Sequence, residues 1–420
     1  MRFDSLQAWL DWQSQLHPTE IELGLERVGS VWSRLHPAPL SSPVITVAGT
    51  NGKGSSVAFF EAIFKAGGYR VGCYTSPHML RYNERIRLTG REVSDERLCQ
   101  AFEQVDQVRG DTPLTYFEFG ALAALLIFSS EPLDVIVLEV GLGGRLDAVN
   151  IIDADVALIT TVDIDHCDWL GETREEIGRE KAGIMRPGHP VVFAGSNPPG
   201  SVILEAERLG SPLLRSGVDF TFQTDQQGWE WRGRHQRRHA LPYPHLRGAH
   251  QLANAAAVLM VLECLEQTLP LDQQAIRSGL QAAALPGRFQ VIGQAPVAIF
   301  DVAHNPEAVR TLQQNLNEMP CSGKTLALFS MLEDKDIDEV VRTIAPSIDY
   351  WYLAPLAVPR AAATARLVQA LTTAGVEKQR FECRSDLISA FQTAKERGGL
   401  DDRIIVFGSF FTVATLLEHC

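Results

Sequence analysis

Three observations predict an α/β protein with two domains. Strand-like apolar runs alternate with amphipathic helical runs in both halves of the chain, which is the pattern of a parallel, doubly wound sheet. Residues 219–241 interrupt this pattern with short alternating runs, which predict a small antiparallel insertion. The Pro286-Gly287 pair then separates the two series, so we expect domains at residues 1–286 and 287–420.

The first series predicts a parallel sheet with helices between its strands. The expected strands are residues 44–48, 70–74, 134–140, 156–162 and 190–193, and the expected helices are 55–65, 116–129, 173–182, 249–266 and 272–284. Within the insertion, Trp229 and Trp231 stand among Arg and His residues. This composition suits a nucleic-acid contact or a solvated hairpin edge, and we expect the hairpin edge.

The second series predicts a Rossmann-like domain with a parallel sheet. Its expected strands are residues 297–301, 325–330, 349–354 and 403–407, and its expected helices are 306–317, 337–345, 361–374, 385–396 and 410–418. Two α/β domains that meet at a Pro-Gly hinge predict a cleft that closes on substrates.

The composition predicts a cytoplasmic protein that binds neither nucleic acid nor membranes. The chain has 38 Lys and Arg against 51 Asp and Glu, a net charge of −13, whereas binders of those surfaces carry a basic face. Its richest apolar run, residues 120–128, is too short to span a bilayer, and the N-terminus lacks the apolar segment of a signal peptide. Seven scattered cysteines without a Cys-x-x-Cys pair suit free thiols.

The most informative segment is a glycine-rich turn between an apolar strand and a helix. It runs Gly49, Thr50, Asn51, Gly52, Lys53, Gly54, Ser55. Backbone N–H groups at such a helix start bind phosphate oxygens, so the turn predicts a nucleoside triphosphate. It departs from the Walker A pattern because Val47 replaces the first glycine and the hydroxyl group comes one residue late. The alternative is a tight turn with a solvated lysine.

Three polar clusters follow in the first domain. Glu139 interrupts an apolar strand, where an unpaired carboxylate is costly, so it is either a magnesium ligand or the partner of an Arg or Lys. His166 follows Asp163 and Asp165, and it suits a hard cation only as a minority ligand, with a satisfied His as the equal alternative. Lys181 stands near the glycine that ends a helix, and taken alone it predicts a solvated lysine.

One polar cluster in the second domain ends a strand and opens a helix. It contains Asp301, His304 and Asn305, and Pro306 suits the first helical turn. We expect these side chains to face the cleft opposite the glycine-rich turn, as contacts for a second substrate and the nucleotide. The alternative is an Asn helix cap beside a satisfied His.

These clusters, in this order, resemble the Mur ligase superfamily, and within it the branch of folylpolyglutamate synthases and dihydrofolate synthases. Length and motif spacing are most similar to the bacterial bifunctional members. The matching segments run across nearly the whole chain and are residues 22–28, 49–55, 75–78, 116–118, 139–150, 165–166, 179–183, 287–288 and 301–306. Each segment alone is unspecific, whereas the set is highly specific.

The resemblance implies ATP-dependent ligation of L-glutamate to dihydropteroate and to reduced folates such as tetrahydrofolate. ATP would convert a substrate carboxylate into an acyl phosphate, which has a good leaving group, and the amine of glutamate would attack it. The cofactors implied are ATP and Mg²⁺ at two sites, with K⁺ as a further candidate cation. A monomer is the default expectation.

The resemblance also implies roles for single residues. Lys53, Lys181 and His304 would be catalytic, and Lys181 would be carbamylated and therefore able to engage magnesium. The implied nucleotide contacts are Gly49, Thr50, Asn51, Gly52, Lys53, Gly54, Ser55, Asn254, Arg288, Asp301, His304 and Asn305. The implied metal ligands are Ser55, Ser76, Glu139, His166 and Lys181. The implied substrate contacts are Thr115, Phe117, Asp147 and Ala148 for the pterin and Ser409 for glutamate, although Phe117 judged alone is equally a core residue.

Three competing classes remain. A peptidoglycan Mur ligase needs a nucleotide-sugar-binding domain before the loop, and only 48 residues precede Gly49. A P-loop kinase or NTPase switch would not need the second-domain cluster around His304. A catalytically silent scaffold should lack Lys53, Glu139 or Lys181, and all three are present. Within the resemblance, a folylpolyglutamate synthase with one activity, or another Mur-type amino-acid ligase, stays open.

Overall fold

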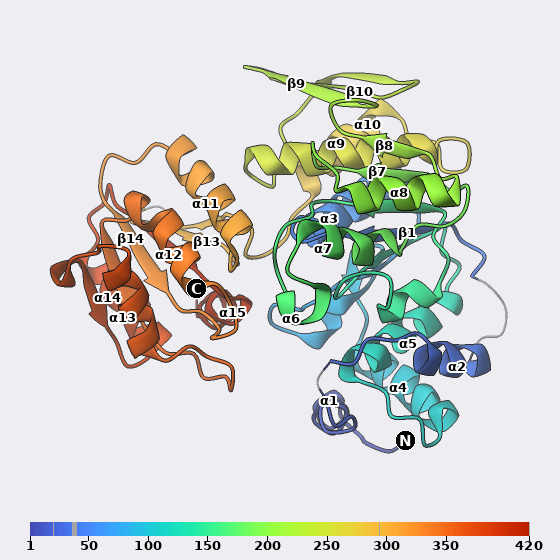
Figure 1. Ribbon diagram of the computed structural model, residues 1–420, viewed down its shortest axis with the longest axis horizontal. Coiled ribbons are helices and arrows are strands. Elements are labelled where there is room, and N and C mark those ends of the chain that lie inside the picture. The colour runs from blue at the N-terminus through green and yellow to red at the C-terminus, as the bar shows by residue number, and fades with distance from the viewer. Residues whose placement is uncertain (20, 36–39, 294, 420) are drawn as a thin grey trace. The chain divides into compact units, whose positions relative to one another are not determined.

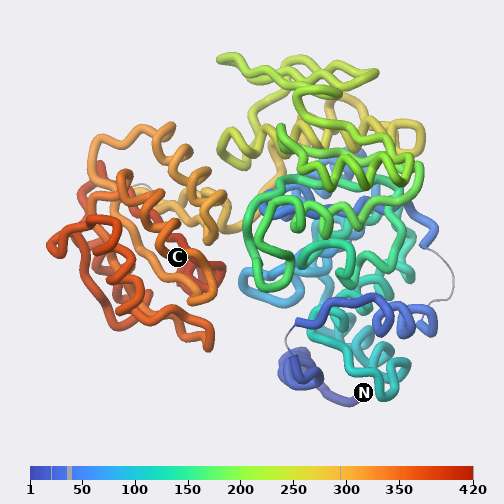
Figure 2. Tube along the Cα trace, viewed as in Figure 1, coloured from blue at the N-terminus to red at the C-terminus, as the bar shows by residue number. Residues whose placement is uncertain are grey.

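The computed structural model describes residues 1–19, 21–35, 40–293 and 295–419. These residues fold into two compact units, which can be followed by residue number in Figures 1 and 2. Unit 1 contains residues 1–245 and 251–284, and unit 2 contains residues 246–250 and the chain from Leu285 onward. Each unit is built around its own sheet, which confirms the predicted α/β class.

The sheet of unit 1 has the strand order β4-β3-β2-β5-β1-β6-β7-β8. Its strands are β1 Val44–Ala48, β2 Val71–Tyr74, β3 Ile86–Leu88, β4 Arg91–Glu92, β5 Val135–Glu139, β6 Val156–Ile159, β7 Val191–Phe193 and β8 Leu213–Arg215. All five predicted strands are confirmed and pair in parallel. The sheet is not wholly parallel, because β3 and β4 extend one edge with antiparallel pairing. These edge strands and β8 are too short for a sequence periodicity to predict them.

Helices of unit 1 follow the capping signals in the sequence. They are α1 Leu6–Gln13, α2 Glu26–Leu35, α3 Lys53–Ala66, α4 Asp95–Arg109, α5 Tyr116–Ser129, α6 Cys167–Leu170, α7 Arg174–Ala182, α8 Gly200–Leu209, α9 Ala249–Cys264 and α10 Gln273–Ala282, with 3₁₀ turns η1 Tyr82–Arg85 and η2 Ala148–Ile151. Helix α5 starts from a capping box, since Thr115 Oγ1 accepts from Glu118 N and Glu118 Oε2 accepts from Thr115 N. Helix α3 begins at Lys53, earlier than the predicted Ser55.

The insertion forms a three-stranded antiparallel sheet from β9 Thr221–Asp225, β10 Gly228–Arg232 and β11 Arg237–Leu241. The expected solvated hairpin edge is wrong for its tryptophans, because Trp229 and Trp231 are both buried. The indole of Trp231 donates to Ala256 O in α9 at 3.0 Å, and that of Trp229 donates to Pro242 O at 2.9 Å. One face of the small sheet therefore packs on unit 1 instead of facing solvent.

Unit 2 contains a six-stranded sheet in the order β12-β13-β17-β14-β15-β16 within the part of the chain that the structure describes. Its strands are β12 Gln290–Ile292, β13 Val297–Phe300, β14 Thr325–Phe329, β15 Tyr350–Leu353, β16 Phe381–Cys383 and β17 Arg403–Phe407. Its helices are α11 Pro306–Glu318, α12 Ile337–Ile344, α13 Thr364–Thr373, α14 Leu387–Arg397 and α15 Phe410–Leu417, with 3₁₀ turns η3 Ala345–Ser347 and η4 Lys378–Arg380. The predicted wholly parallel sheet is wrong at one edge, where β12 pairs antiparallel with β13.

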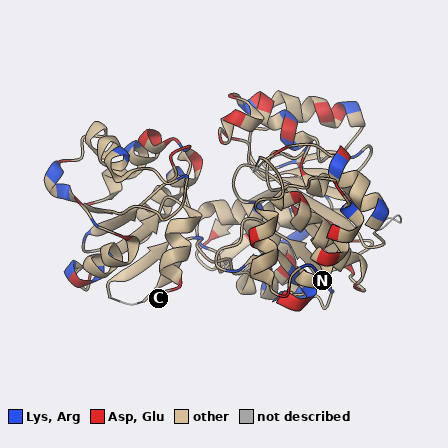
Figure 3. Ribbon diagram, turned by 90° about the horizontal axis from the view of Figure 1, so that it is seen from below, with Lys and Arg blue, Asp and Glu red and all other residues tan. Residues whose placement is uncertain are grey.

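Charge and cysteine usage agree with the composition. Acidic and basic residues are interspersed along the helices of both units (Figure 3). The six cysteines that the structure describes are free thiols, as predicted. No helix among the described residues is long and apolar enough to cross a membrane.

Helix α3, which follows the glycine-rich turn, is held in place by close packing against α10. A Cβ atom added to Gly279 of α10 would lie 2.4 Å from Cα and 2.7 Å from N of Ile63 in α3. These are backbone atoms of a central helix, so they can give way only if α3 moves.

We expect Gly279→Ala to destabilise unit 1 by about 1–3 kcal/mol, because overpacking forces a backbone shift. Urea denaturation should show a lower midpoint, and the matched change Gln274→Ala on the exposed side of α10 should shift it much less. Equal midpoints for the two variants would contradict the close α3–α10 contact.

Candidate active site

The glycine-rich turn is shaped by the end of β6. Gly49 has φ 152°, and a Cβ atom there would lie 1.8 Å from Thr160 Oγ1, so no larger residue fits. Thr160 Oγ1 donates to Asn51 O at 2.5 Å, and Thr161 Oγ1 accepts from Asn51 N at 3.1 Å. Thr50 Oγ1 both donates to and accepts from the backbone of Asp163, at 3.0 Å each way. The turn is therefore preorganised by hydrogen bonds to one neighbouring strand end.

The start of α3 fits a phosphate group. Gly52 is its N-cap residue with φ 87°, and no side chain caps the first amides of the helix. A Cβ atom on Gly52 would lie 2.7 Å from Asn254 Oδ1, so glycine lets α9 approach the turn closely. First-turn N–H groups without a side-chain cap and the positive end of the helix dipole favour an anion.

Polar side chains of α9 form a hydrogen-bonded chain to the start of α3. Asn254 Nδ2 donates to Gln251 Oε1 at 3.2 Å, and Gln251 Nε2 donates to Ser55 Oγ at 3.1 Å. All three side chains are buried. The sequence names Ser55 and Asn254 as candidates, whereas Gln251 has no sequence signal and emerges only from the structure.

The side chain of Lys53 contacts the carbonyl groups of the glycine-rich turn. Its ammonium group donates to Gly49 O at 2.8 Å and to Thr50 O at 3.2 Å. Its charge also acts on Asp147, where it helps to lower the pKa against the larger effect of burial. The lysine thus belongs both to the phosphate turn and to the surroundings of the predicted substrate residue Asp147.

Two predicted metal ligands meet at neighbouring strand ends. Glu139 is the last residue of β5, is only 4% exposed and lies opposite Val47 in the β1–β5 register. Its Oε2 atom accepts from the backbone N–H of Ser76, which follows β2, at 3.4 Å. A buried carboxylate beside a serine is a hard oxygen donor set, so these residues fit Mg²⁺.

The other metal candidates come from separate segments. His166 has φ 53°, is the N-cap of α6, and its Nε2 lies 4.0 Å from Asp165 Oδ2. Lys181 is 3% exposed within α7, a burial that contradicts the solvated lysine of the local sequence pattern. Among the described residues no group of three or more His, Cys, Asp or Glu side chains has a metal-binding arrangement. The predicted set contains only two such residues, Glu139 and His166, so this finding does not test it.

A cavity of about 1050 Å³ lies in unit 1 beside these strand ends. Six residues predicted from the sequence line it, namely Ser76, Thr115, Phe117, Asp147, Ala148 and His166. The structure therefore brings the predicted pterin contacts to one place together with two predicted metal ligands. The volume and the mixture of aromatic and polar walls are typical of a small-molecule site.

The carboxylate of Asp147 is held on the cavity wall by three backbone amides. Its Oδ2 accepts from the amides of Gly141 and Leu142 at 3.0 and 2.9 Å, and its Oδ1 accepts from Val149 N at 3.1 Å. Burial raises the pKa of Asp147 to about 6, although these hydrogen bonds oppose that rise. Phe117 rests against Gly141, where a Cβ atom would approach its ring to 2.6 Å. Phe117 is thus part of the cavity wall as well as of the packing.

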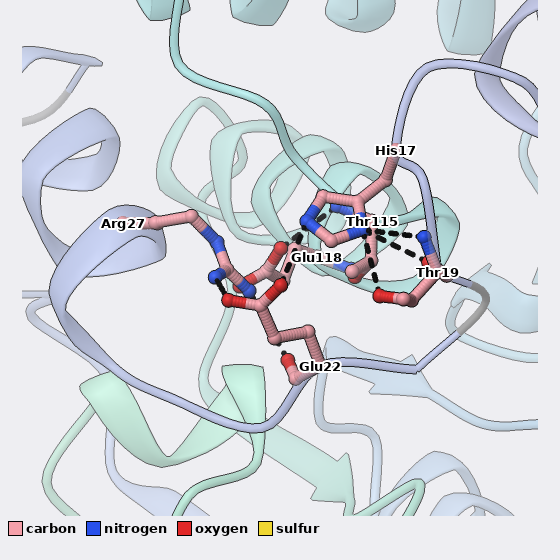
Figure 4. A network of polar contacts seen from close by, with 6 residues as sticks. All are labelled: His17, Thr19, Glu22, Arg27, Thr115 and Glu118. Atoms are coloured by element: carbon pink, nitrogen blue, oxygen red, sulfur yellow. Dashed lines mark hydrogen bonds and ion pairs between the residues drawn. The ribbon is translucent and has the colours of Figure 1, made fainter.

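A chain of polar contacts joins the N-terminal segment to the cavity (Figure 4). His17 Nε2 lies 3.1 Å from Glu22 Oε2, and Glu22 also pairs with Arg27. Arg27 Nη2 donates to Glu118 Oε1 at 3.1 Å, and Glu118 closes the capping box with Thr115. The sequence shows the Thr-x-x-Glu pattern of the capping box. It does not show that Glu118 is linked through Arg27 and Glu22 to His17.

A second group on the cavity wall is cationic and aromatic. Arg85 Nε donates to His78 Nδ1 at 2.8 Å, and the guanidinium carbon lies 5.2 Å from the ring centroid of Tyr82 and 5.6 Å from that of Tyr116. Burial, and then the charge of Arg85, lower the pKa of His78 to about 4. The sequence gives no signal for Arg85.

The predicted residues of unit 2 also lie together. Asp301 follows β13 and is half-buried; desolvation raises its pKa, while Arg288 and hydrogen bonds from the amides of Ala303 and Phe289 lower it. Arg288 lies over the ring of Phe410 at 5.1 Å, and the His304 ring lies 6.0 Å from the same ring. His304 Nδ1 contacts Val302 O at 2.9 Å, which fixes the orientation of its imidazole.

Two predicted residues of unit 2 are helix caps. Asn305 is the N-cap of α11 and accepts from Ala308 N at 2.9 Å, and Ser409 is the N-cap of α15 and accepts from Phe411 N at 3.1 Å. Gly408 N donates to Ala303 O at 3.0 Å, so the ends of β13 and β17 and the two helix starts form one edge. The Asn cap that the sequence offers as an alternative is present, and it does not conflict with a binding role for the cap residue.

Comparison with known proteins identifies the family. The Mur ligase middle domain matches residues 47–262, and the Mur ligase glutamate ligase domain matches residues 287–410. The dihydrofolate synthase/folylpolyglutamate synthase of Escherichia coli K12 is 42% identical over 98% of this chain and 95% of its own length. The enzyme of the same name from Haemophilus influenzae is 40% identical, and the match covers 97% of this chain and 96% of that protein.

Solved structures give the same result. The structure of E. coli FolC in complex with DHPP and ADP has a TM-score of 0.94 and 41% identity, and the match covers 99% of this chain and 97% of that one. The bifunctional enzyme of Yersinia pestis complexed with AMPPNP and Mn ion has a TM-score of 0.92 and 46% identity. That match covers 99% of this chain and 98% of that one. The chain therefore belongs to the Mur ligase family, in the branch of the dihydrofolate synthases/folylpolyglutamate synthases.

Proposed function

We propose that this protein ligates L-glutamate to dihydropteroate and to reduced folates at the expense of ATP. An oxygen of the substrate carboxylate attacks the γ-phosphorus of ATP, and ADP leaves. The glutamate amine then attacks the acyl phosphate, loses a proton and expels phosphate, which leaves an amide. For a folate that already carries glutamate, the carboxylate that reacts is the γ-carboxylate.

The observation that carries this proposal is the cavity in unit 1. Its wall combines Thr115, Phe117, Asp147 and Ala148 with Ser76, so a pterin and a reacting carboxylate have candidate partners in one space. Relatives of nearly the same length carry this pair of activities in their names, and related structures hold ADP, DHPP or L-glutamate.

The phosphate-binding role falls to the glycine-rich turn. The amides at the start of α3 and the ammonium group of Lys53 bind the β- and γ-phosphates, and Asn254 packs against the turn at Gly52. Lys53 must leave its carbonyl partners on the turn to reach the nucleotide. Because the turn is already ordered by Thr160 and Thr161, little reorganisation is needed elsewhere.

Ser55, Ser76, Glu139, His166 and carbamylated Lys181 would hold Mg²⁺ at two sites, with K⁺ as a further candidate. When bound, magnesium offsets the negative charge that develops on the transferred phosphoryl group. A carbamate on Lys181 would turn a buried cation into a carboxylate, whose oxygen atoms are the ligands that Mg²⁺ prefers.

The remaining roles divide between the two domains that the sequence predicts. Residues 1–286 bind ATP and the folate substrate, and residues 287–420 supply Arg288, Asp301, His304 and Asn305 to the nucleotide and Ser409 to glutamate. The protein acts in the cytoplasm as a monomer. The specific alternative is a folylpolyglutamate synthase that does not accept dihydropteroate.

The proposal is tested by single omission of substrates. With ATP and magnesium present, phosphate release should require glutamate together with dihydropteroate or tetrahydrofolate. Lys53→Met should lower the rate by about 100-fold or more, because it removes a cation from the transferred phosphate. Lys65→Met, at the exposed end of the same helix, should keep the rate within about twofold. Release that ignores glutamate would refute the ligase, and activity with tetrahydrofolate alone would support the alternative.

We expect Lys181→Ala to lose most activity and to regain part of it when bicarbonate or acetate is added, because a small carboxylate can replace the carbamate. Arg179→Ala, on the exposed side of the same helix, should keep its activity without any added anion. A ¹³C carbamate resonance should appear when the unmodified protein is equilibrated with labelled CO₂. Full activity of Lys181→Ala, without an anion effect, would exclude the modification.

The pKa of Asp147, raised to about 6, predicts a pH effect on substrate binding. The carboxylate that accepts N–H groups of a pteridine is present above pH 6 and is lost by protonation as the pH falls. The KM for dihydropteroate should therefore rise as the pH falls through about 6. Asp147→Asn removes the titrating group, so this rise should disappear; if it persists in that variant, another group controls binding.

A further inference from the structure

Arg85 differs from the other charged side chains on the cavity wall. It is only 8% exposed, its Nε donates to Nδ1 of His78, and aromatic rings of Tyr82 and Tyr116 lie against its guanidinium group. No carboxylate among the described residues forms an ion pair with it. Because burying a charge without a counter-charge is costly, this position favours an anion as its partner.

The arginines nearby are paired. Arg81, which also lines the cavity, lies 3.7 Å from Glu92 and 3.5 Å from Asp95. Arg27 pairs with Glu22 and with Glu118. Arg81 and Arg27 thus each pair with carboxylates of the protein, in contrast to Arg85.

Glu84, the residue before Arg85, and Asp147 on the cavity wall both use their carboxylates to bind the backbone. Glu84 accepts from the amides of Met79, Leu80 and Arg81 at 2.6 to 2.7 Å. Asp147 accepts from three further amides. Both carboxylates are therefore committed to the backbone, and the position of Arg85 suits an anionic group of a bound molecule.

The position of Arg85 limits which part of a substrate it can meet. Its carbonyl oxygen accepts from Thr75 N at 2.8 Å, so its backbone lies beside the residue that precedes Ser76. The register of β2 and β3, which pairs Tyr74 with Ile86, fixes this neighbourhood. Arg85 is thus anchored next to the segment that carries Ser76, a proposed magnesium ligand of the reaction centre.

We infer that Arg85 binds the non-reacting α-carboxylate of a folate that already carries glutamate, and this inference rests on the proposed function. Such a substrate has two carboxylates at its end, of which only the γ-carboxylate is phosphorylated. Dihydropteroate has one carboxylate, which reacts. Arg85 therefore determines specificity for tail extension over the first ligation.

The chemistry of the side chain suits this task. With Nε committed to His78, the two terminal nitrogens form the edge that can bind a carboxylate through two parallel hydrogen bonds. The rings of Tyr82 and Tyr116 hold the guanidinium plane, so little side-chain entropy is lost when the ligand binds.

The test compares both ligations in Arg85→Gln, Arg85→Lys and the unmodified protein. Arg85→Gln should lower the ratio of kcat/KM for tetrahydrofolate to kcat/KM for dihydropteroate by about 10- to 100-fold, as expected for a lost charge-assisted contact. Arg85→Lys should restore part of the ratio because it keeps the charge. Arg91→Gln, which changes an exposed arginine of β4 outside the cavity lining, should leave the ratio within about twofold.

A second measurement uses the unmodified protein and so does not depend on whether the variants fold. A tetrahydrofolate analogue with 4-aminobutyrate in place of glutamate keeps the reacting carboxylate and lacks the α-carboxylate. It should bind about 10- to 100-fold more weakly than tetrahydrofolate, and Arg85→Gln should bind the two alike. Equal loss of both ligations in Arg85→Gln, or equal binding of analogue and folate by the unmodified protein, would overturn the inference. Failure of the unmodified protein to catalyse either ligation would instead refute the proposed function.

Discussion

The active site of unit 1 depends on one constraint, which is that four neighbouring parallel strands end at the same edge of the sheet. The order β2-β5-β1-β6 and the pairing of Val47 with Glu139 and of Ala48 with Ile159 align these ends. The residues that follow, Ser76, Gly49 and Thr160, are thereby placed close together although they are distant in the sequence. A register shift of one residue would turn Glu139 to the opposite face of the sheet and separate it from Ser76.

Around this edge some charged side chains pair with one another, and others are held by neutral groups. Glu118 and Arg27 satisfy each other, and their pairing orders the helix start at Thr115. Asp147 accepts hydrogen bonds from backbone amides, and burial raises its pKa to about 6. Arg85 donates to an imidazole and lies against aromatic rings, and no carboxylate among the described residues forms an ion pair with it. Lys53 donates to carbonyl groups of the turn. Cations that contact neutral groups beside the glycine-rich turn suit a substrate with several negative groups.

The sequence predicts the fold well where the periodicity is long and the turn chemistry is specific. The strands at residues 44–48 and 403–407 and the helix at 116–129 have the predicted bounds. It predicts the short edge strands and the burial of Trp229 and Trp231 poorly, because both depend on contacts with distant segments. For the site, the motif residues are recognisable because their chemistry is local, as in the turn at Gly49. Gln251 and Arg85 are not recognisable, because an amide on an apolar helix and an arginine after a short turn gain meaning only from what folds against them.

The cavity must serve two substrates whose reacting carboxylates differ in position. The phosphate turn is fixed by Thr160 and Thr161, so the carboxylate that reacts has to reach the same point in both ligations. In a folate with glutamate, the reacting γ-carboxylate lies farther from the pteridine than the carboxylate of dihydropteroate does, because an amide and the glutamate side chain stand between them. The pteridine of the folate must then lie deeper or at a different angle, and a cavity of about 1050 Å³, at the upper end of the usual range for ligand sites, provides the room. The size of the cavity alone does not determine which of these two pteridine positions a substrate takes, because both substrates carry the same ring. The added α-carboxylate is the only new charged group, so a cation fixed beside the reaction centre is the simplest means of holding the longer substrate in register.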